Sequence, residues 1–106
     1  MHVICEIQLK AGKRDEYLQA LAKCLPNILE CDGCDFFYPL VDTAPNLDYT
    51  HATFPEPRKD FVTVIERWQK MADYNEYLQS SVKDEFGSLV HSLIESANIR
   101  VLSKPG

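Results

Sequence analysis

The sequence predicts an α+β fold in which four strands and three helices form a single domain. Three observations support this prediction: a strong strand signal at residues 60–70, helical spacing of apolar residues at 13–30, and two further helical stretches followed by a last strand. The chain has 106 residues, of which 45% are hydrophobic and 25% are charged, so it has room for one ordinary globular domain and not for two.

The strongest element is the stretch DFVTVIERWQK at residues 60–70, which is rich in β-branched and aromatic side chains. In a strand, alternate residues point to opposite faces. One face then carries Val62, Val64, Glu66 and Trp68, and the other carries Phe61, Thr63, Ile65 and Arg67. Because both faces are largely apolar, we expect this strand to be covered on both sides.

Glu66 and Trp68 are two residues apart and therefore share a face of this strand. The indole N–H of Trp68, the only tryptophan, needs a hydrogen-bond partner when it is buried. Two interpretations stay open. Trp68 is either a core residue near the end of the sheet, with Arg67 paired to a surface acid, or the polar-tipped aromatic wall of a ligand pocket.

The first part of the chain predicts a strand followed by a helix. Residues 2–9 alternate with one clean apolar face, as a strand does. Residues 13–30 carry apolar side chains at helical spacing, with acids in the first turn. Pro26 cannot donate a backbone hydrogen bond, so it should kink this helix or start a second short one.

A turn signal at Asp32-Gly33 leads into a second strand at residues 34–41. Pro39 has no N–H to give to a neighbouring strand, which indicates an edge strand or a bulge. This strand puts Phe36, Tyr38 and Leu40 on one face and Phe37 and Val41 on the other.

Residues 43–59 form a long, proline-containing insertion, within which residues 49–54 have the composition of a short strand. A long connection in a small domain is often a lid or a partner-binding arm, and a plain surface insertion is the alternative.

The last part of the chain predicts helices at residues 71–79 and 82–93 and a strand at 98–103. The complete order, β-α-β-β-α-α-β, is that of the ferredoxin-like split βαβ fold. Helices cover one face of such a sheet. The apolar residues on the other face need a second cover, and a second copy of the chain is the simplest candidate.

The charge pattern excludes several classes of partner. The net charge is −5 and the basic residues are scattered, so we expect no binding to nucleic acid or to anionic membranes. No apolar run approaches the roughly 20 residues of a membrane span, and the N-terminus has no cationic start of a secretory signal. We therefore expect a cytoplasmic protein whose four cysteines are reduced thiols.

The histidines and the cysteine pair give few further candidates. His2, His51 and His91 have no spacing that brings them together, so we expect no metal site. His51 lies in the insertion, which can fold over a pocket, and is a candidate base. The pair Cys31 and Cys34 closes a helix rather than opening one, and so lacks the dipole that lowers a thiol pKa in redox motifs.

Aromatic residues give the best evidence for a pocket. Several fall on elements that the fold brings together, which favours either an aromatic core or a site for a flat aromatic ligand. They are Phe36, Tyr38, Trp68, Tyr74, Tyr77 and Phe86.

Three segments together resemble a known family: VICEIQLKAGKRDEYLQAL, DGCDFFYPLVD and VIERWQKMADYNEYLQSSVKDEF. Their order and spacing are similar to those of the antibiotic biosynthesis monooxygenase domain family, which includes quinol monooxygenases. The resemblance implies a homodimer whose two sheets close into a dimeric α+β barrel, with a pocket between each sheet and its helices. It also implies oxidation of a quinol-like or polyphenolic aromatic molecule by dioxygen, with no cofactor, because the substrate anion itself reduces oxygen.

Within this resemblance, Trp68 matches the tryptophan that follows the family's glutamate and would be a pocket wall or hydrogen-bond donor. Family members often carry histidines where this chain has Tyr77 and Val82. The catalytic candidates are then His51, Tyr77 and Asn75. The substrate-binding candidates are Trp68, Glu66, Tyr38, Phe36, Tyr74 and Phe86.

Two other functions stay open. Replacement of the family histidines favours a non-catalytic dimer that binds a small hydrophobic ligand or serves as a regulatory module. Haem binding is a third alternative and would need His51 or His91 as an axial ligand.

Overall fold

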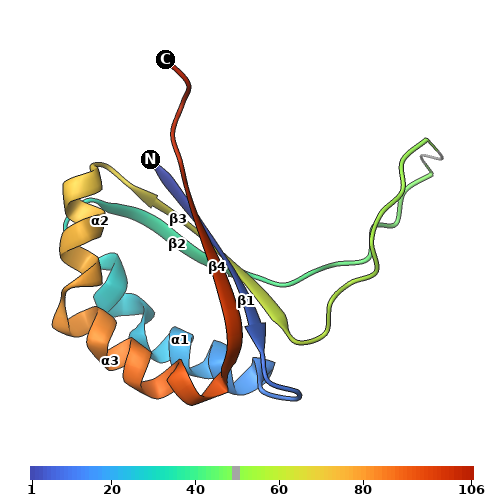
Figure 1. Cartoon of the computed structure of the whole chain (residues 1–106), viewed down its shortest axis with the longest axis horizontal. Coiled ribbons are helices and arrows are strands. Elements are labelled where there is room, and N and C mark those ends of the chain that lie inside the picture. Colours follow the sequence, from blue (N-terminus) through green and yellow to red (C-terminus); the bar gives the residue numbers. More distant parts are fainter. Residues whose placement is uncertain (49–50) are drawn as a thin grey trace.

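The computed structural model describes residues 1–48 and 51–106. Its elements are β1 (His2–Leu9), α1 (Arg14–Leu29), β2 (Cys34–Leu40), β3 (Phe61–Trp68), α2 (Met71–Leu78), α3 (Ser81–Val90), a 3-10 helix (His91–Leu93) and β4 (Ile94–Leu102). The strands form one antiparallel sheet in the order β2-β3-β1-β4, and the helices lie on one side of it (Figure 1). The predicted α+β, ferredoxin-like fold is confirmed.

The two faces of the sheet differ in burial. On β3, Val62, Val64, Glu66 and Trp68 face the helices and are buried, whereas the alternate residues are half-buried or exposed. We expected both faces of β3 to be covered, but within the single chain only the face toward the helices is covered. We call the uncovered side the open face; it carries Ile4, Tyr38, Ile65 and Leu102.

The second strand is placed as its proline predicts. β2 is an edge strand, and its pairing with β3 is irregular between Cys34 and Phe36. The turn before it depends on Gly33, which has φ +78° and whose Cβ, if present, would collide with the side chain of Asp73. The backbone N–H of Gln69 donates to Gly33 O at 2.8 Å, which ties this turn to the end of β3.

Three details differ from the predictions. Helix α1 is one continuous element with Pro26 inside it, so no second helix starts there. Strand β4 begins at Ile94 rather than at residue 98, because pairing with β1 extends into a stretch that has no apolar alternation of its own. The expected strand at 49–54 is absent from residues 51–54, and residues 49–50 lie outside the described part of the chain.

The described residues between β2 and β3, 41–48 and 51–60, include those of the predicted insertion at 43–59 and are here called the arm. They project on the side of the sheet opposite the helices (Figure 1). Arg58 closes its base on Asp42: the Nε of Arg58 donates to Oδ2 at 2.8 Å and its Nη2 to Oδ1 at 3.1 Å. The backbone N–H of Arg58 donates to the same carboxylate at 2.9 Å. The guanidinium also lies 4.2 Å from the centroid of the Phe61 ring, so the arm is held at a fixed base.

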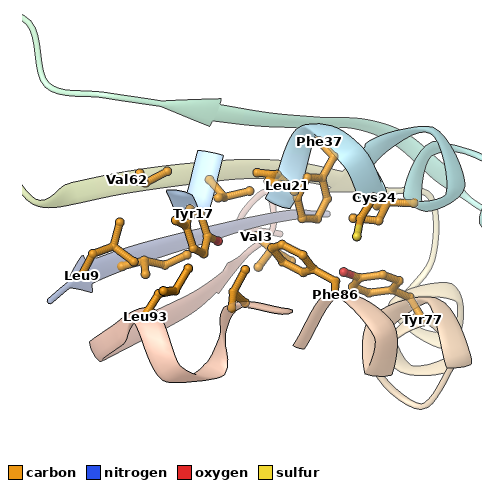
Figure 2. Close-up of a cluster of buried hydrophobic side chains, with 14 of the residues drawn as sticks. Val3, Leu9, Tyr17, Leu21, Cys24, Phe37, Val62, Tyr77, Phe86 and Leu93 are labelled. Atoms are coloured by element: carbon orange, nitrogen blue, oxygen red, sulfur yellow. The ribbon is translucent and has the colours of Figure 1, made fainter. Parts of the chain in front are cut away.

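The core lies between the helices and the covered face of the sheet (Figure 2). Tyr17 of α1 meets Phe86 of α3 edge to face, with ring centroids 5.9 Å apart. Phe37 of β2 meets Tyr77 of α2 in the same manner at 6.3 Å. Aromatic side chains from the sheet and from all three long helices thus converge in one region.

Candidate functional site

A buried carboxylate lies in this aromatic region. Glu66 is 3% exposed and is the one buried charged residue in the described part of the chain. Strand alternation puts it on the covered face of β3, where it pairs with Val3 of β1 and Phe37 of β2. An ionised group in such surroundings is costly unless polar groups compensate it.

Two side chains orient the Glu66 carboxylate. The indole Nε1–H of Trp68 donates to Oε1 at 2.9 Å, and the thiol of Cys5 donates to Oε2 at 3.3 Å. Each carboxylate oxygen keeps a further lone pair for another donor. The group is thus held in one orientation and can still accept a proton from a ligand.

Burial and partners act on the acidity of Glu66 in opposite directions. Burial raises the pKa of Glu66, and the hydrogen bonds from Trp68 and Cys5 and the charge of Lys83 lower it; burial has the larger effect. A carboxylate with a raised pKa is a stronger base and is better matched to proton transfer near neutral pH.

The hydroxyl and thiol groups around Glu66 stay protonated. Burial, followed by the nearby negative groups, raises the pKa of Tyr74 to about 12. The same causes raise the pKa values of Tyr17 and Tyr77 well above the ordinary tyrosine value. Burial and the charge of Glu66 raise the pKa of the Cys5 thiol. These groups can therefore donate hydrogen bonds, and Glu66 is the one acidic side chain among the residues that line the cavity.

A cavity of about 130 Å³ adjoins the carboxylate. Its lining residues Ile99 on β4 and Leu78 on α2 are 59% and 40% exposed, so it opens between these two elements. A cavity of roughly 150 Å³ holds a benzene molecule, whereas sites for larger ligands span roughly 300–1,000 Å³. The cavity thus has the size of one aromatic ring. Its lining is Cys5, Ile7, Tyr17, Phe37, Val64, Glu66, Tyr74, Tyr77, Leu78, Lys83, Phe86, Val90, Ile94, Ala97 and Ile99.

Four of the predicted site residues line this cavity, namely Glu66, Tyr74, Tyr77 and Phe86. Trp68 lies behind them. It is fully buried, and its ring lies 4.9 Å from that of Tyr77, centroid to centroid, and 5.8 Å from that of Tyr74. The interpretation of Trp68 as a core residue, with Arg67 paired to a surface acid, Asp35, is thus confirmed, whereas the interpretation as a pocket wall is wrong, because Trp68 does not line the cavity.

The placement of Phe36 and Tyr38 in the aromatic cluster is wrong. Both rings lie on the open face of the sheet, stacked on each other at 4.8 Å between centroids. The reason is strand alternation: Phe37, between them, points to the helices and takes the place in the cavity lining.

His51 and Asn75 are also outside the cavity lining. His51 lies on the exposed arm. Asn75 is exposed on α2, where its side-chain oxygen accepts a hydrogen bond from Gln79 Nε2 at 3.1 Å. Since neither residue lines the cavity, the fold does not support a direct role for them there.

Four lining residues were not among the predicted site residues: Cys5, Tyr17, Phe37 and Lys83. The apolar alternation of β1 and β2 contains a usable signal for Cys5 and Phe37, because it assigns both to the face shared with Glu66. Tyr17 falls on the buried side of α1. Lys83 has no local signal, since a lysine in the first turn of a helix is ordinarily a surface residue.

The cysteine pair and the possible metal ligands have less support as functional groups than the cavity beside Glu66. Burial raises the pKa of the Cys34 thiol to about 11 and also raises that of Cys31, which is opposite to the shift in reactive cysteines. Among residues 1–48 and 51–106, no group of three His, Cys, Asp or Glu side chains could hold a metal ion. No helix in that part of the chain is long and apolar enough to cross a membrane.

Comparison with known proteins agrees with this architecture. Residues 1–88 match the model of the family described as "Antibiotic biosynthesis monooxygenase". The "Probable quinol monooxygenase YgiN" of Escherichia coli K12 is 30% identical over 106 residues, covering 98% of this chain and 96% of that protein. The crystal structure of PA3566 from Pseudomonas aeruginosa superposes with a TM-score of 0.75 at 14% identity, covering 99% of this chain and 93% of the other. A conserved protein from Methanosarcina mazei superposes with a TM-score of 0.71 at 17% identity, covering 93% and 88%.

Proposed function

Because this chain belongs to the antibiotic biosynthesis monooxygenase family, we propose that it oxidises a small quinol with dioxygen in the cavity beside Glu66, without a cofactor. The observation that carries the proposal is the buried, oriented carboxylate at the wall of a ring-sized cavity. The volume of about 130 Å³ favours a substrate with a single ring over a polycyclic one.

Glu66 has the role of general base. It lines a cavity whose hydroxyl and thiol groups stay protonated, so Glu66 is the proton acceptor of the proposed reaction. It takes the proton of a ring hydroxyl, and the resulting quinolate gives one electron to dioxygen. The semiquinone and superoxide combine at a ring carbon, and the resulting peroxide anion takes the proton back from Glu66. The hydroperoxide then loses water, and Glu66 is again a carboxylate. Quinol and dioxygen become hydroxyquinone and water, so the reaction needs no further reductant.

The surrounding side chains orient the reactants. Trp68 and Cys5 hold the carboxylate, and the rings of Phe37, Tyr77 and Phe86 give a flat ligand apolar surface to pack against. Tyr74 and Tyr77 stay protonated and so donate hydrogen bonds to oxygen atoms of the ring or of reduced dioxygen. Holding these groups in place before the reaction lowers the barrier.

The proposed active form is a homodimer. The open face carries half-buried Ile4 and Ile65 and the exposed side chains Tyr38 and Leu102. A second copy placed on this face would bury them, which supports pairing of the two sheets. The arm lies on the same side and would flank the partner (Figure 1).

One observation favours the alternative of a non-catalytic ligand-binding dimer. Both oxygens of Glu66 already accept a hydrogen bond, so the carboxylate is compatible with a purely structural role. In that case the cavity would bind a single-ring molecule and release it unchanged.

Oxygen consumption separates the two functions. The wild-type protein, Glu66→Gln and the exposed control Glu95→Gln are compared with hydroquinone, methylhydroquinone and a two-ring naphthoquinol, each against a protein-free blank for autoxidation. We expect uptake with the single-ring quinols, a loss of about 100-fold or more in Glu66→Gln, and no change in Glu95→Gln. Equal rates in Glu66→Gln and the wild type would exclude Glu66 as the base. No uptake above the blank with any quinol would favour the binding function.

A further inference from the structure

A single cation lines the cavity. Of the lining residues, only Glu66 and Lys83 are charged. Lys83 lies in the first turn of α3, and its Nζ is 5.9 Å from the centroid of the Phe86 ring, another lining residue. Lys83 is half-buried and lines the cavity.

The ammonium of Lys83 has no carboxylate partner in contact. The ion pairs in the described part of the chain are Lys13–Glu16, Arg58–Asp42 and Arg67–Asp35, and none involves Lys83. The charge of Lys83 slightly lowers the pKa values of both Glu66 and Cys5, against the larger raising effect of burial. The same cavity is thus lined by a buried carboxylate and by an ammonium that has no ion-pair partner in the described part of the chain.

We propose that Lys83 is the anion-binding group of this cavity and holds the oxygen of a single-ring phenolate. The assignment rests on the proposed function for its catalytic meaning. When Glu66 takes the ring proton, the negative charge moves from the carboxylate to the ring oxygen, while the total charge of the site stays the same. Lys83 is then beside the new anion and stabilises it, and it also stabilises the superoxide that forms next.

This role defines the ligand class. A buried carboxylate alone would repel an anionic ring, and an apolar cavity alone would bind any small aromatic molecule. With Lys83 present, the cavity favours rings that carry an ionisable hydroxyl over isosteric rings such as toluene. The selectivity arises because the ammonium stabilises the ionised hydroxyl of the ligand. An opposite charge at about 4–6 Å typically lowers the pKa of an acid by one unit or more.

The test uses 4-nitrophenol, a single-ring phenol whose phenolate absorbs visible light. Wild-type protein, Lys83→Met and Lys83→Arg are titrated, together with the control Lys23→Met on the exposed side of α1. At a pH well below the pKa of free 4-nitrophenol, we expect the phenolate fraction of the ligand bound to the wild type to be about ten times that of the free ligand. Lys83→Met should lose this increase, Lys83→Arg should keep most of it, and Lys23→Met should behave as the wild type.

The Met variant retains the helix cap, because the backbone N–H of residue 83 donates to Ser80 Oγ at 3.2 Å whatever the side chain. If Lys83→Met does not fold by circular dichroism, Lys83→Gln provides the same test with a polar side chain. An unchanged phenolate fraction in the charge-removing variant, or no binding of 4-nitrophenol by the wild type, would overturn the proposal.

Oxygen consumption keeps this inference separate from the proposed oxidation. If no quinol is oxidised but the phenolate signal depends on Lys83, the oxidation is wrong and the anion site stands. If quinols are oxidised and the phenolate absorbance is the same in Lys83→Met as in the wild type, the proposed oxidation is supported and the proposed anion site is wrong. If both hold, Lys83→Met should lower kcat more than it raises KM, and Lys83→Arg should recover most of kcat.

Discussion

The indole N–H of Trp68 donates a 2.9 Å hydrogen bond to Oε1 of Glu66, two residues earlier on the same strand. The bond joins the largest buried side chain to the one buried carboxylate in the described part of the chain. It satisfies the polar atom of Trp68 and orients Glu66 with a single contact. The pair Glu66-x-Trp68 is therefore the element on which the proposed chemistry depends.

Trp68→Phe should separate packing from orientation. Phenylalanine fills most of the indole volume but leaves Oε1 of Glu66 without its donor, at a cost of about 1–3 kcal/mol in the free energy of unfolding. The pKa of Glu66 should rise further, so the pH at which activity reaches half its plateau should move upward. Urea unfolding and a pH–rate profile measure the two effects. Tyr38→Phe, on the open face, is the control, and an identical pH profile in Trp68→Phe would contradict the assigned role.

Glu66→Gln should alter the pH dependence of stability. The pKa of Glu66 is raised in the folded state, so its contribution to stability is present at low pH and is lost as the pH rises through the folded pKa. The glutamine variant has no such loss. Its stability relative to the wild type should increase as the pH rises from below the ordinary glutamate pKa of 4.5 to about 8, as measured by urea unfolding at about pH 4 and about pH 8. A difference that stays constant or falls over this range would show that the carboxylate is not destabilised by burial.

Asp42→Asn should loosen the base of the arm. Hydrogen bonds from Arg58 lower the pKa of Asp42 to about 2, so the pair is intact above the ordinary pKa of an aspartate and is lost as the pH falls through about 2. Asparagine has one acceptor oxygen and no charge, so it loses the bond that Arg58 makes to one of the two carboxylate oxygens, and Arg58 becomes more mobile. Trypsin should then cleave after Arg58 or Lys59 faster than in the wild type, while the melting temperature changes little. Asp48→Asn, elsewhere on the arm, should be cleaved at the wild-type rate.

Phe37→Ala and Phe36→Ala should behave differently although they are neighbours. Phe37 is buried in the cavity lining, and its removal should cost about 3–5 kcal/mol in the free energy of unfolding. Phe36 lies on the open face, and its removal should cost a single chain about 1 kcal/mol or less. In sedimentation experiments, Phe36→Ala should weaken the proposed dimer. Equal losses of stability without any effect on association would contradict the assigned faces.

The sequence determined the elements through local patterns. Alternation on β3 fixed that Glu66 and Trp68 share a face, and the missing N–H of Pro39 fixed that β2 lies at an edge. The same alternation assigned Phe36 and Phe37 to opposite faces, but it did not say which face the helices cover. That choice depends on packing between segments distant in the chain, which is why the aromatic cluster was predicted with Phe36 and Tyr38 instead of Phe37.

The tertiary structure alone decided the composition of the site. Cys5 meets Glu66 across 61 positions of the sequence, through a register between β1 and β3 that no local pattern specifies. Lys83 reaches the cavity because α3 packs over the sheet, although its own neighbourhood is that of a surface residue. Short-range periodicity records which way a side chain points, whereas the groups it meets depend on how whole elements pack. The sequence therefore determined the strand that carries the carboxylate, and the fold decided which donors and which cation surround it.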